Sequence, residues 1–285
     1  MKKVFILFLS LFLLTGCSFT NSNNESKVYT TYYPFEYATR YMYGEFADIS
    51  SIYPSEVDID TYELTNKQRE KYSNGNIFVY TGLTKEVKLA VDFVNTNRKL
   101  NLIDATNALS FTSGVEELWL NPSNYLMIAR NIKTTLTDYE PNLFNREKVN
   151  ELYEELKIKI SELDVEYTMM GSNASRKDLL IADDALAFLS KYNINVLSLD
   201  PNNENYSRSY NEAKRLASTG SIKYIYVLKG KTLSNEIETF ITENNLEKEE
   251  IETMYTLSEE QRKSSSDYLS IMKENIDMFK TELFR

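Results

Sequence analysis

The sequence predicts an α/β fold of two α/β lobes joined by a long linking helix. In the first half of the chain, short runs of β-branched and aromatic residues alternate with helical patterns, which is typical of α/β proteins. One long amphipathic segment follows, and the alternation of strand and helix patterns then begins again. The length of 285 residues suffices for two ordinary domains or one large one.

The first half contains three expected strands and two expected helices. Pro34 follows the first strand and Thr81-Gly82 follows the second, as is usual where a strand gives way to a turn. The expected strands cover residues 28–33, 77–80 and 100–103, and the expected helices cover residues 35–46 and 85–95.

The linking helix is predicted from its periodicity. Between residues 145 and 164, apolar side chains recur at spacings of three and four, which places one stripe along a helix of roughly 30 Å. The stripe consists of Val149, Leu152, Tyr153, Leu156, Ile160 and Leu163. Such a helix can bridge two lobes, or it can be an ordinary amphipathic surface helix; periodicity does not separate these alternatives.

The second half repeats the α/β pattern. Its expected strands cover residues 179–182, 195–199 and 224–228, and its expected helices cover residues 185–192 and 264–283. Trp119, which lies before the linking helix, is expected to be a core ring.

The N-terminus resembles a bacterial lipoprotein signal. Lys2 and Lys3 precede an apolar run, and Leu14-Thr15-Gly16-Cys17 looks like a lipobox, in which cysteine becomes the lipidated first residue. The apolar run is shorter than the ~20 residues that span a bilayer. The alternative is an ordinary signal peptide with an incidental cysteine. We therefore expect an extracytoplasmic protein anchored to the cell membrane by a lipid at Cys17, and a polar tether after it.

Composition excludes several classes of function. The chain has 42 acidic and 32 basic residues and a net charge of −10, so nucleic acid is not an expected partner. It has no histidine and one cysteine, which excludes Ser-His and Cys-His catalysis, imidazole metal sites and an internal disulfide. Phosphate-binding glycine motifs are missing from the sequence. The sequence gives no support for an enzyme, and a hydrolase that uses carboxylates is the weakest candidate function.

Five segments, in order, resemble the solute-binding lipoproteins of zinc and manganese ABC importers. They are an opening strand with Tyr-Pro (residues 29–34), a strand that ends in Gly-Leu (77–83), Leu118-Trp119-Leu120-Asn121-Pro122, Asp184-Ala185 with Phe188-Leu189 and Tyr192, and a C-terminal helix (267–275). The resemblance runs from about residue 29 to residue 283 and implies a ligand cleft between the two lobes.

The resemblance implies a function and a division of the chain. We expect a monomeric, membrane-anchored solute-binding protein that captures its ligand without chemistry and delivers it to an ABC permease. The expected parts are a signal peptide (1–16), a lipidated tether (17–27), an N-terminal α/β lobe (28–144), the linking helix (145–165) and a C-terminal α/β lobe (166–285).

The ligand positions depart from the family pattern. Family members hold metal with histidines and carboxylates, whereas this chain has Asp60, Glu117 and Asp183 at the positions that we can trace. Glu63 is a further ligand candidate, and Tyr255 aligns loosely with the last ligand, where we find no convincing carboxylate. Asp58, Glu116 and Asp184 are expected to be solvated or to support the ligands.

Acidic residues at these positions admit two interpretations. In a rebuilt site, the carboxylates bind a divalent cation, with oxygen donors suited to Mn²⁺, Mg²⁺ or Ca²⁺ more than to Zn²⁺. In a decayed site, the metal is lost and the protein acts as a surface adhesin or interaction lipoprotein. The sequence leaves the cation, among Mn, Zn, Mg and Ca, open.

Overall fold

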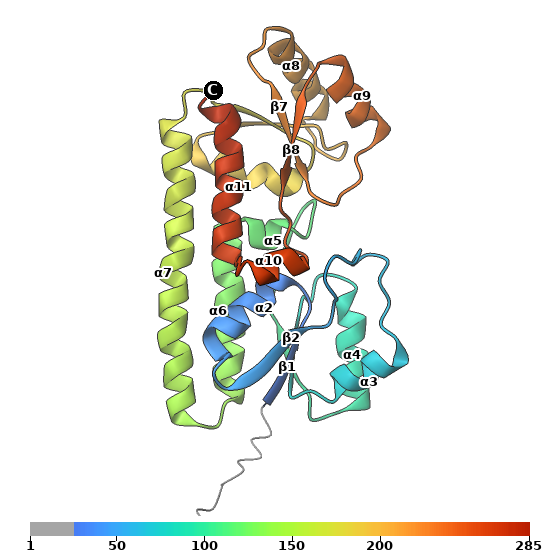
Figure 1. The fold of residues 1–285 in the computed structure, drawn as a ribbon, viewed down its shortest axis with the longest axis vertical. Helices are drawn as coiled ribbons and strands as arrows, with labels where there is room; N and C mark the ends of the chain where they lie inside the picture. Colours follow the sequence, from blue (N-terminus) through green and yellow to red (C-terminus); the bar gives the residue numbers. More distant parts are fainter. Residues whose placement is uncertain (1–25) are drawn as a thin grey trace, which may run out of the picture.

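A computed structural model describes residues 26–285 as two lobes, each built on a four-stranded parallel sheet (Figure 1). In the N-terminal lobe the strand order is β2-β1-β3-β4, and in the C-terminal lobe it is β6-β5-β7-β8. The bounds are β1 (Ser26–Thr30), β2 (Ala47–Ser51), β3 (Ile77–Tyr80), β4 (Asn101–Asp104), β5 (Asp178–Ile181), β6 (Asn195–Ser198), β7 (Tyr224–Leu228) and β8 (Glu247–Ile251). This arrangement confirms the predicted fold class.

The predictions for the signal peptide, for Cys17 and for most of the tether lie outside the described residues. Strand β1 begins at Ser26, so the last two residues of the predicted tether belong to the first sheet. Across residues 26–285, no helix combines the length and the apolar character that a membrane crossing requires.

Some helices form the crossovers between strands, and three others, α6, α7 and α11, form a long spine. Their bounds are α2 (Tyr33–Tyr43), α3 (Asn66–Ser73), α4 (Glu86–Thr96), α5 (Glu117–Leu120), α6 (Pro122–Tyr139), α7 (Leu143–Asn173), η2 (Asp184–Tyr192), α8 (Tyr206–Ser218), α9 (Asn235–Glu243), α10 (Glu259–Lys263) and α11 (Tyr268–Leu283).

Several predicted elements have other bounds in the structure. The first strand was predicted to reach residue 33, but it ends at Thr30, because α2 begins at Tyr33 with Pro34 in its first turn, where proline is tolerated. The helix predicted over residues 35–46 therefore covers residues 33–43, and the helix predicted over residues 264–283 begins at Tyr268. The helix expected over residues 185–192 is the 3₁₀ helix η2, which is followed by Asn193 in the left-handed region with φ 59°.

Helix α7 is the predicted linking helix and is longer at both ends than predicted. It has 31 residues and runs along both lobes beside α6 and α11 (Figure 1). Asn142 caps its start by accepting a hydrogen bond from the backbone N–H of Phe144 at 2.9 Å. At its other end, Gly171 packs against the carbonyl oxygen of Tyr192. The helix therefore bridges the lobes and is not a surface helix of one of them.

The core forms one large cluster and one smaller outer cluster. The large cluster contains the N-terminal lobe, the spine of α6, α7 and α11, and the inner face of the C-terminal sheet. Along β5, Leu179 and Ile181 belong to the large cluster, while Leu180 belongs to the outer one, because successive strand side chains point to opposite faces. Helices α8 and α9 cover that outer face.

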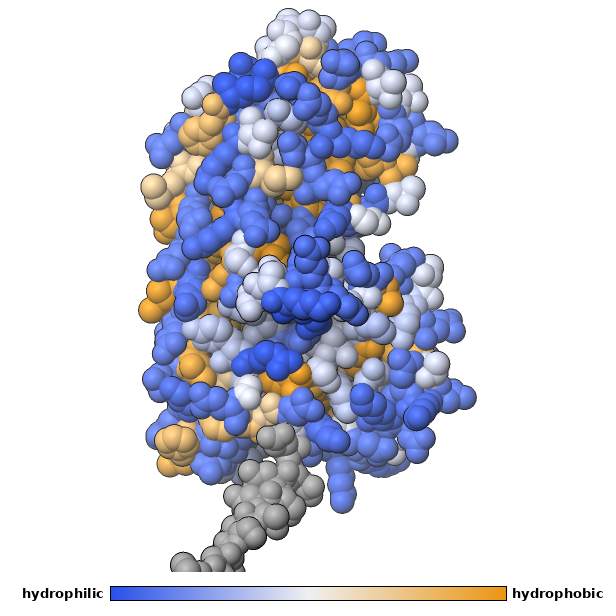
Figure 2. Space-filling view, in the orientation of Figure 1, coloured by the Kyte–Doolittle hydropathy of each residue, from blue (hydrophilic) through white to orange (hydrophobic). Residues whose placement is uncertain are grey.

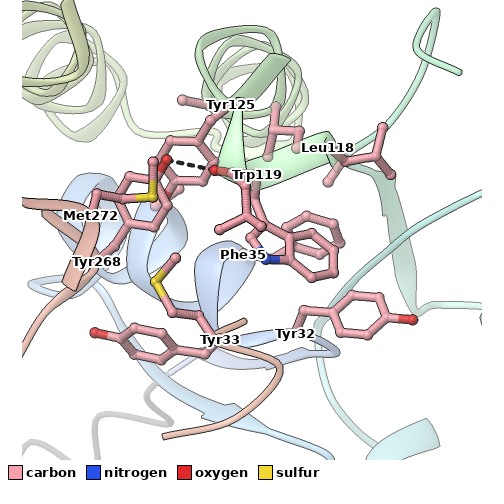
Figure 3. Close-up of a cluster of buried hydrophobic side chains, with 14 of the residues drawn as sticks. Tyr32, Tyr33, Phe35, Leu118, Trp119, Tyr125, Tyr268 and Met272 are labelled. Carbon is pink, nitrogen blue, oxygen red and sulfur yellow. Dashed lines mark hydrogen bonds between the residues drawn. The ribbon is translucent and has the colours of Figure 1, made fainter. Parts of the chain in front are cut away.

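Trp119 lies at the centre of an aromatic group between the lobes (Figure 3). The ring is fully buried, and its Nε1–H donates to the carbonyl oxygen of Thr253 at 2.7 Å. The Tyr268 hydroxyl donates to the carbonyl oxygen of Trp119 at 2.7 Å. The prediction that Trp119 is a core ring is confirmed.

Candidate cation site in the interlobe cleft

The cleft lies where the strands of both sheets end. A cavity of 390 Å³ is lined by Tyr32 after β1, residues 56–60 after β2, residues 229–231 after β7 and residues 252–258 after β8. Figure 2 shows a hollow between the lobes on the side away from α7. Ligands of open α/β sheets bind outside the carboxyl ends of their strands, so the topology places loop side chains of both lobes around one space.

Lys231 stands between two carboxylates at this cleft. Its Nζ is 2.9 Å from Glu116 Oε1 and 2.9 Å from Asp183 Oδ2. Glu116 lies at the start of α5, within the predicted N-terminal lobe (28–144), whereas Lys231 follows β7 and Asp183 follows β5, within the predicted C-terminal lobe (166–285). With that division, the ammonium links carboxylates of the two lobes.

The carboxylate of Glu116 is the most buried member of this group. Its side chain has no exposed surface, and its Oε1 also accepts a hydrogen bond from the Tyr255 hydroxyl. Its Oε2 has no hydrogen-bond partner among the described residues. A methyl group at Gly114 would lie 2.4 Å from that Oε2 atom and 3.2 Å from Lys231 Nζ, so glycine leaves the space in which the two charged groups meet.

Burial and charge act in opposite directions on Lys231. Burial alone lowers the pKa of its ammonium, but the negative charges of Glu116 and Asp183 outweigh this effect and raise it. Burial, followed by the charge of Glu116, raises the pKa of the Tyr255 phenol. The ammonium stays charged and the phenol stays protonated at neutral pH.

Asp183 holds its position through local backbone contacts. It caps η2, because its Oδ1 accepts a hydrogen bond from the backbone N–H of Ala185 at 2.8 Å, while its Oδ2 faces Lys231. The side chain of Asp183 is 20% exposed, so it remains accessible from the cleft. Of the predicted ligands, Asp183 and Tyr255 thus meet around the Glu116–Lys231 pair.

The other predicted ligands lie apart from this group, and of them only Asp60 lines the cleft cavity. Asp60 is an exposed residue that lines the cavity, and its carbonyl oxygen accepts a hydrogen bond from Lys85 Nζ at 2.8 Å. Glu63 is exposed beside a second depression next to α3 and α4. Glu117 is half-buried, and burial raises the pKa of its carboxyl, with a lowering contribution from the backbone of Thr112.

No group of three or more carboxylates lies close enough together to hold a metal ion anywhere in residues 26–285. A cation that used Asp60, Glu117 and Asp183 together would therefore require the cleft to rearrange. Their assignment as ligands stays a prediction.

Sequence reasoning missed Glu116 and Lys231, and each carried a signal. Glu116 lies three and four positions before the apolar residues Trp119 and Leu120, which puts it on the same buried helix face. Lys231 follows the apolar strand β7 after two residues, at the sheet edge where ligands bind.

Comparison with known proteins shows the family. The model described as zinc-uptake complex component A, periplasmic, matches residues 28–282, and the model for the prokaryotic membrane lipoprotein lipid attachment site matches residues 1–18. The second range includes Cys17, the predicted lipid position. The protein is thus a lipid-anchored, extracytoplasmic one.

Relatives of this family match along most of the chain. A Bacillus subtilis protein named high-affinity zinc uptake system protein ZnuA is 24% identical over 312 residues, which cover 98% of this chain and 97% of that protein. The zinc-binding protein AdcA of Streptococcus pyogenes is 23% identical across 97% of this chain, which spans 61% of AdcA.

Solved structures share the fold. The metal-dependent lipoprotein YcdH of Bacillus subtilis has a TM-score of 0.73 at 23% identity and covers 91% of this chain and 100% of its own. The Zn(II)-bound ZnuA-like domain of Streptococcus pneumoniae AdcA has a TM-score of 0.72 at 21% identity, with 92% and 100% covered.

Fold, lipid attachment signal and family match agree. The family is a metal-binding transport component and not an enzyme family, and its members work with an ABC permease and an ATPase. This chain belongs to the zinc-uptake complex component A family of extracytoplasmic solute-binding lipoproteins.

Proposed function

We propose that this lipoprotein captures a divalent cation in its interlobe cleft and delivers it to an ABC permease. One observation supports the cation: carboxylates of the two lobes, Glu116 and Asp183, already face a single positive charge at 2.9 Å each. Relatives with this fold include proteins described as zinc-binding.

The donors in this cleft are oxygen atoms. Carboxylate and phenol oxygens suit Mn²⁺, Mg²⁺ and Ca²⁺ in coordination preference, whereas zinc sites favour imidazole and thiolate. We propose Asp183 as a direct ligand, with Asp60 joining from the cleft wall and Glu117 from α5 when the cation binds. Asp60 has the freedom to do so, because it is exposed on a loop that lines the cavity.

Calorimetry of the purified lipoprotein with Mn²⁺, Zn²⁺, Mg²⁺ and Ca²⁺ tests this proposal. We expect one cation to bind at one site, and Asp183→Asn to weaken its binding at least about tenfold. Asp277→Asn is the matched control, since that carboxylate pairs with Lys280 at 2.6 Å on the surface of α11. At a hundredfold excess over its dissociation constant, the cation should stabilise the fold by ~2.7 kcal/mol.

A second candidate function is a family member that binds no metal and acts as an adhesin or interaction lipoprotein. Two observations favour it: the ammonium of Lys231 already neutralises part of the carboxylate charge, and no group of three carboxylates lies together within residues 26–285. A wild-type protein that gives no calorimetric heat and no shift in melting with any of the four cations would favour this candidate.

A further inference from the structure

We infer that Lys231 is a built-in competitor for the cation, whose ammonium occupies the place between Glu116 and Asp183 that a divalent cation would take. This inference deepens the proposed function and rests on it, because it concerns the affinity of the same site. It assigns Lys231 a role in deciding whether, and how tightly, the cleft takes a metal.

The geometry around Lys231 is that of a cation in a binding site. Its Nζ contacts one oxygen of Glu116 and one of Asp183, each at 2.9 Å. The second oxygen of Glu116 is buried and has no hydrogen-bond partner in the described part of the chain. This oxygen remains available to a ligand of positive charge, and burying it unpaired costs free energy.

The ammonium and a metal ion exclude each other because both are positively charged. Glu116 and Asp183 supply two negative charges, of which Lys231 neutralises one. A divalent cation would neutralise both, but with Lys231 in place it would lie within a few ångströms of a like charge, which is strongly unfavourable in a partly buried site. The metal therefore binds only when Lys231 leaves its two carboxylates.

The chain gives Lys231 a route out of the cleft. Its side chain is 34% exposed, and it follows Gly230, which has a positive φ of 83°, in the loop after β7. Lys229, two residues earlier, lies at the rim of the same cleft, where it pairs with Glu252 at 2.8 Å and is 54% exposed. Lys231 can thus turn outward without moving the sheet.

The bridge also joins the lobes. Because Glu116 belongs to one lobe and Lys231 to the other, the ion pair holds the cleft walls together in the absence of metal. A cation that replaces the ammonium makes the same link, so the lobes should move little when it binds, as the packed helix α7 also requires.

Calorimetric titration with Mn²⁺, Zn²⁺ and Ca²⁺ of the full lipoprotein and three variants tests the inference. Lys231→Met removes the charge and keeps an apolar stem, Lys231→Arg keeps the charge, and Lys248→Met is the matched control, because Lys248 pairs with Glu238 at 3.0 Å on an exposed surface outside the cleft. We expect Lys231→Met to bind at least one of these cations about tenfold or more tightly than the wild type. Lys248→Met should bind as the wild type does, and Lys231→Arg, which keeps the competing charge, should bind less tightly than Lys231→Met.

The outcomes separate this inference from the proposed function. If Lys231→Met binds a cation and the wild type does not, the competitor role holds and cation capture by the natural protein fails. If both bind equally, cation capture stands and the competitor role is overturned. If neither binds while both melt cooperatively, both ideas are overturned.

A measurement on the wild type covers the case in which Lys231→Met fails to fold. An amine-acetylating reagent, read out by mass spectrometry, reports how often each lysine is exposed. At a cation concentration at which calorimetry shows the site filled, acetylation of Lys231 should increase at least about threefold relative to Lys248, which lies outside the cleft. Unchanged acetylation of Lys231 in the filled site would overturn the inference.

Discussion

The two lobes share one strand order but differ in how they are joined to the spine. In the N-terminal lobe, both faces of the sheet belong to the large core that also contains α6, α7 and α11. In the C-terminal lobe, only the inner face of the sheet joins that core, and the outer face forms a separate cluster under α8 and α9.

The difference shows that two sheets with the same strand order can be coupled to the spine to different extents. The large cluster is rich in rings, among them Trp119, Tyr125 and Tyr268 (Figure 3), and it crosses from lobe to lobe. The outer cluster is mostly aliphatic, with Phe240 as its large buried ring. Local unfolding follows such cooperative units, so we expect α8 and α9 to open before the rest of the structure.

Loss of the central ring should have the largest effect on this comparison. Trp119→Ala should lower the free energy of unfolding by about 3–5 kcal/mol, since it empties a fully buried site and removes the hydrogen bond to Thr253. Chemical denaturation followed by far-UV circular dichroism measures the loss. Hydrogen exchange should rise in both lobes; a rise confined to α5 would contradict a single interlobe core.

The contact between α7 and η2 tests the link between the spine and the C-terminal lobe. A methyl group at Gly171 would lie 1.7 Å from the carbonyl oxygen of Tyr192, and backbone cannot yield as a flexible side chain does. Gly171→Ala should therefore cost about 3 kcal/mol, the upper part of the range for overpacking. The exposed neighbour gives a control, Ser172→Ala, which should melt like the wild type.

A matched pair of methylene deletions compares the two clusters directly. Ile103 lies in the large cluster and Ile225 in the outer one, and both are fully buried. Each change to valine should cost about 0.5–1.5 kcal/mol. Hydrogen exchange in Ile225→Val should rise mainly in α8, α9 and β7, whereas in Ile103→Val it should rise through the lobe and the spine. Identical exchange patterns would mean that the molecule is one cooperative unit.

A surface ion pair should have the smallest effect. Asp164 on α7 lies 2.9 Å from Lys191 Nζ and accepts a hydrogen bond from the Tyr192 hydroxyl at 2.7 Å. Burial raises the pKa of its carboxyl, but the hydrogen bonds from Lys191 and Tyr192 outweigh this effect and lower it. Asp164→Asn should cost less than about 1 kcal/mol at neutral pH, because the pair is partly exposed.

The lowered pKa of Asp164 also sets the direction of its pH dependence. The stabilisation is present above the ordinary aspartate pKa of about 3.9 and is lost as pH falls through the lower pKa of the folded state. The melting temperatures of wild type and Asp164→Asn should therefore converge in acid. A difference that persists in strong acid would show that the charge of Asp164 is not its source.

Elements with a strong apolar pattern could be predicted, and polar edge strands could not. Strands β3 and β7 match their predicted ranges, because β-branched and aromatic runs reflect burial on both faces. Strands β2 and β8 at sheet edges were not predicted; β8 reads Glu247-Lys248-Glu249-Glu250-Ile251. Their strand state comes from backbone pairing with β1 and β7, which side-chain patterns do not report.

The candidate site shows the same division. Asp183 and Tyr255 were candidates because they align with family-like motifs, Tyr255 only loosely, and the structure places both beside the Glu116–Lys231 pair. Their role as ligands stays a prediction. The choice between Glu116 and Glu117 could not be read from the chain, since it depends on which side of a one-turn helix faces the cleft. The contact between Lys231 and Glu116 depends on how the two sheets are oriented relative to each other.

The amino-acid sequence by itself determined the α/β class, the long bridging helix, the membrane-anchored family and the absence of imidazole ligands, because these follow from local periodicity, composition and short motifs. The tertiary structure alone decided which charges meet. Glu116, Asp183 and Lys231 are separated by 48 or more positions along the chain, and their ion pairs form only because parallel sheets turn their carboxyl ends toward one cleft. Contacts of that range depend on the packing of lobes around α7, which no local pattern encodes.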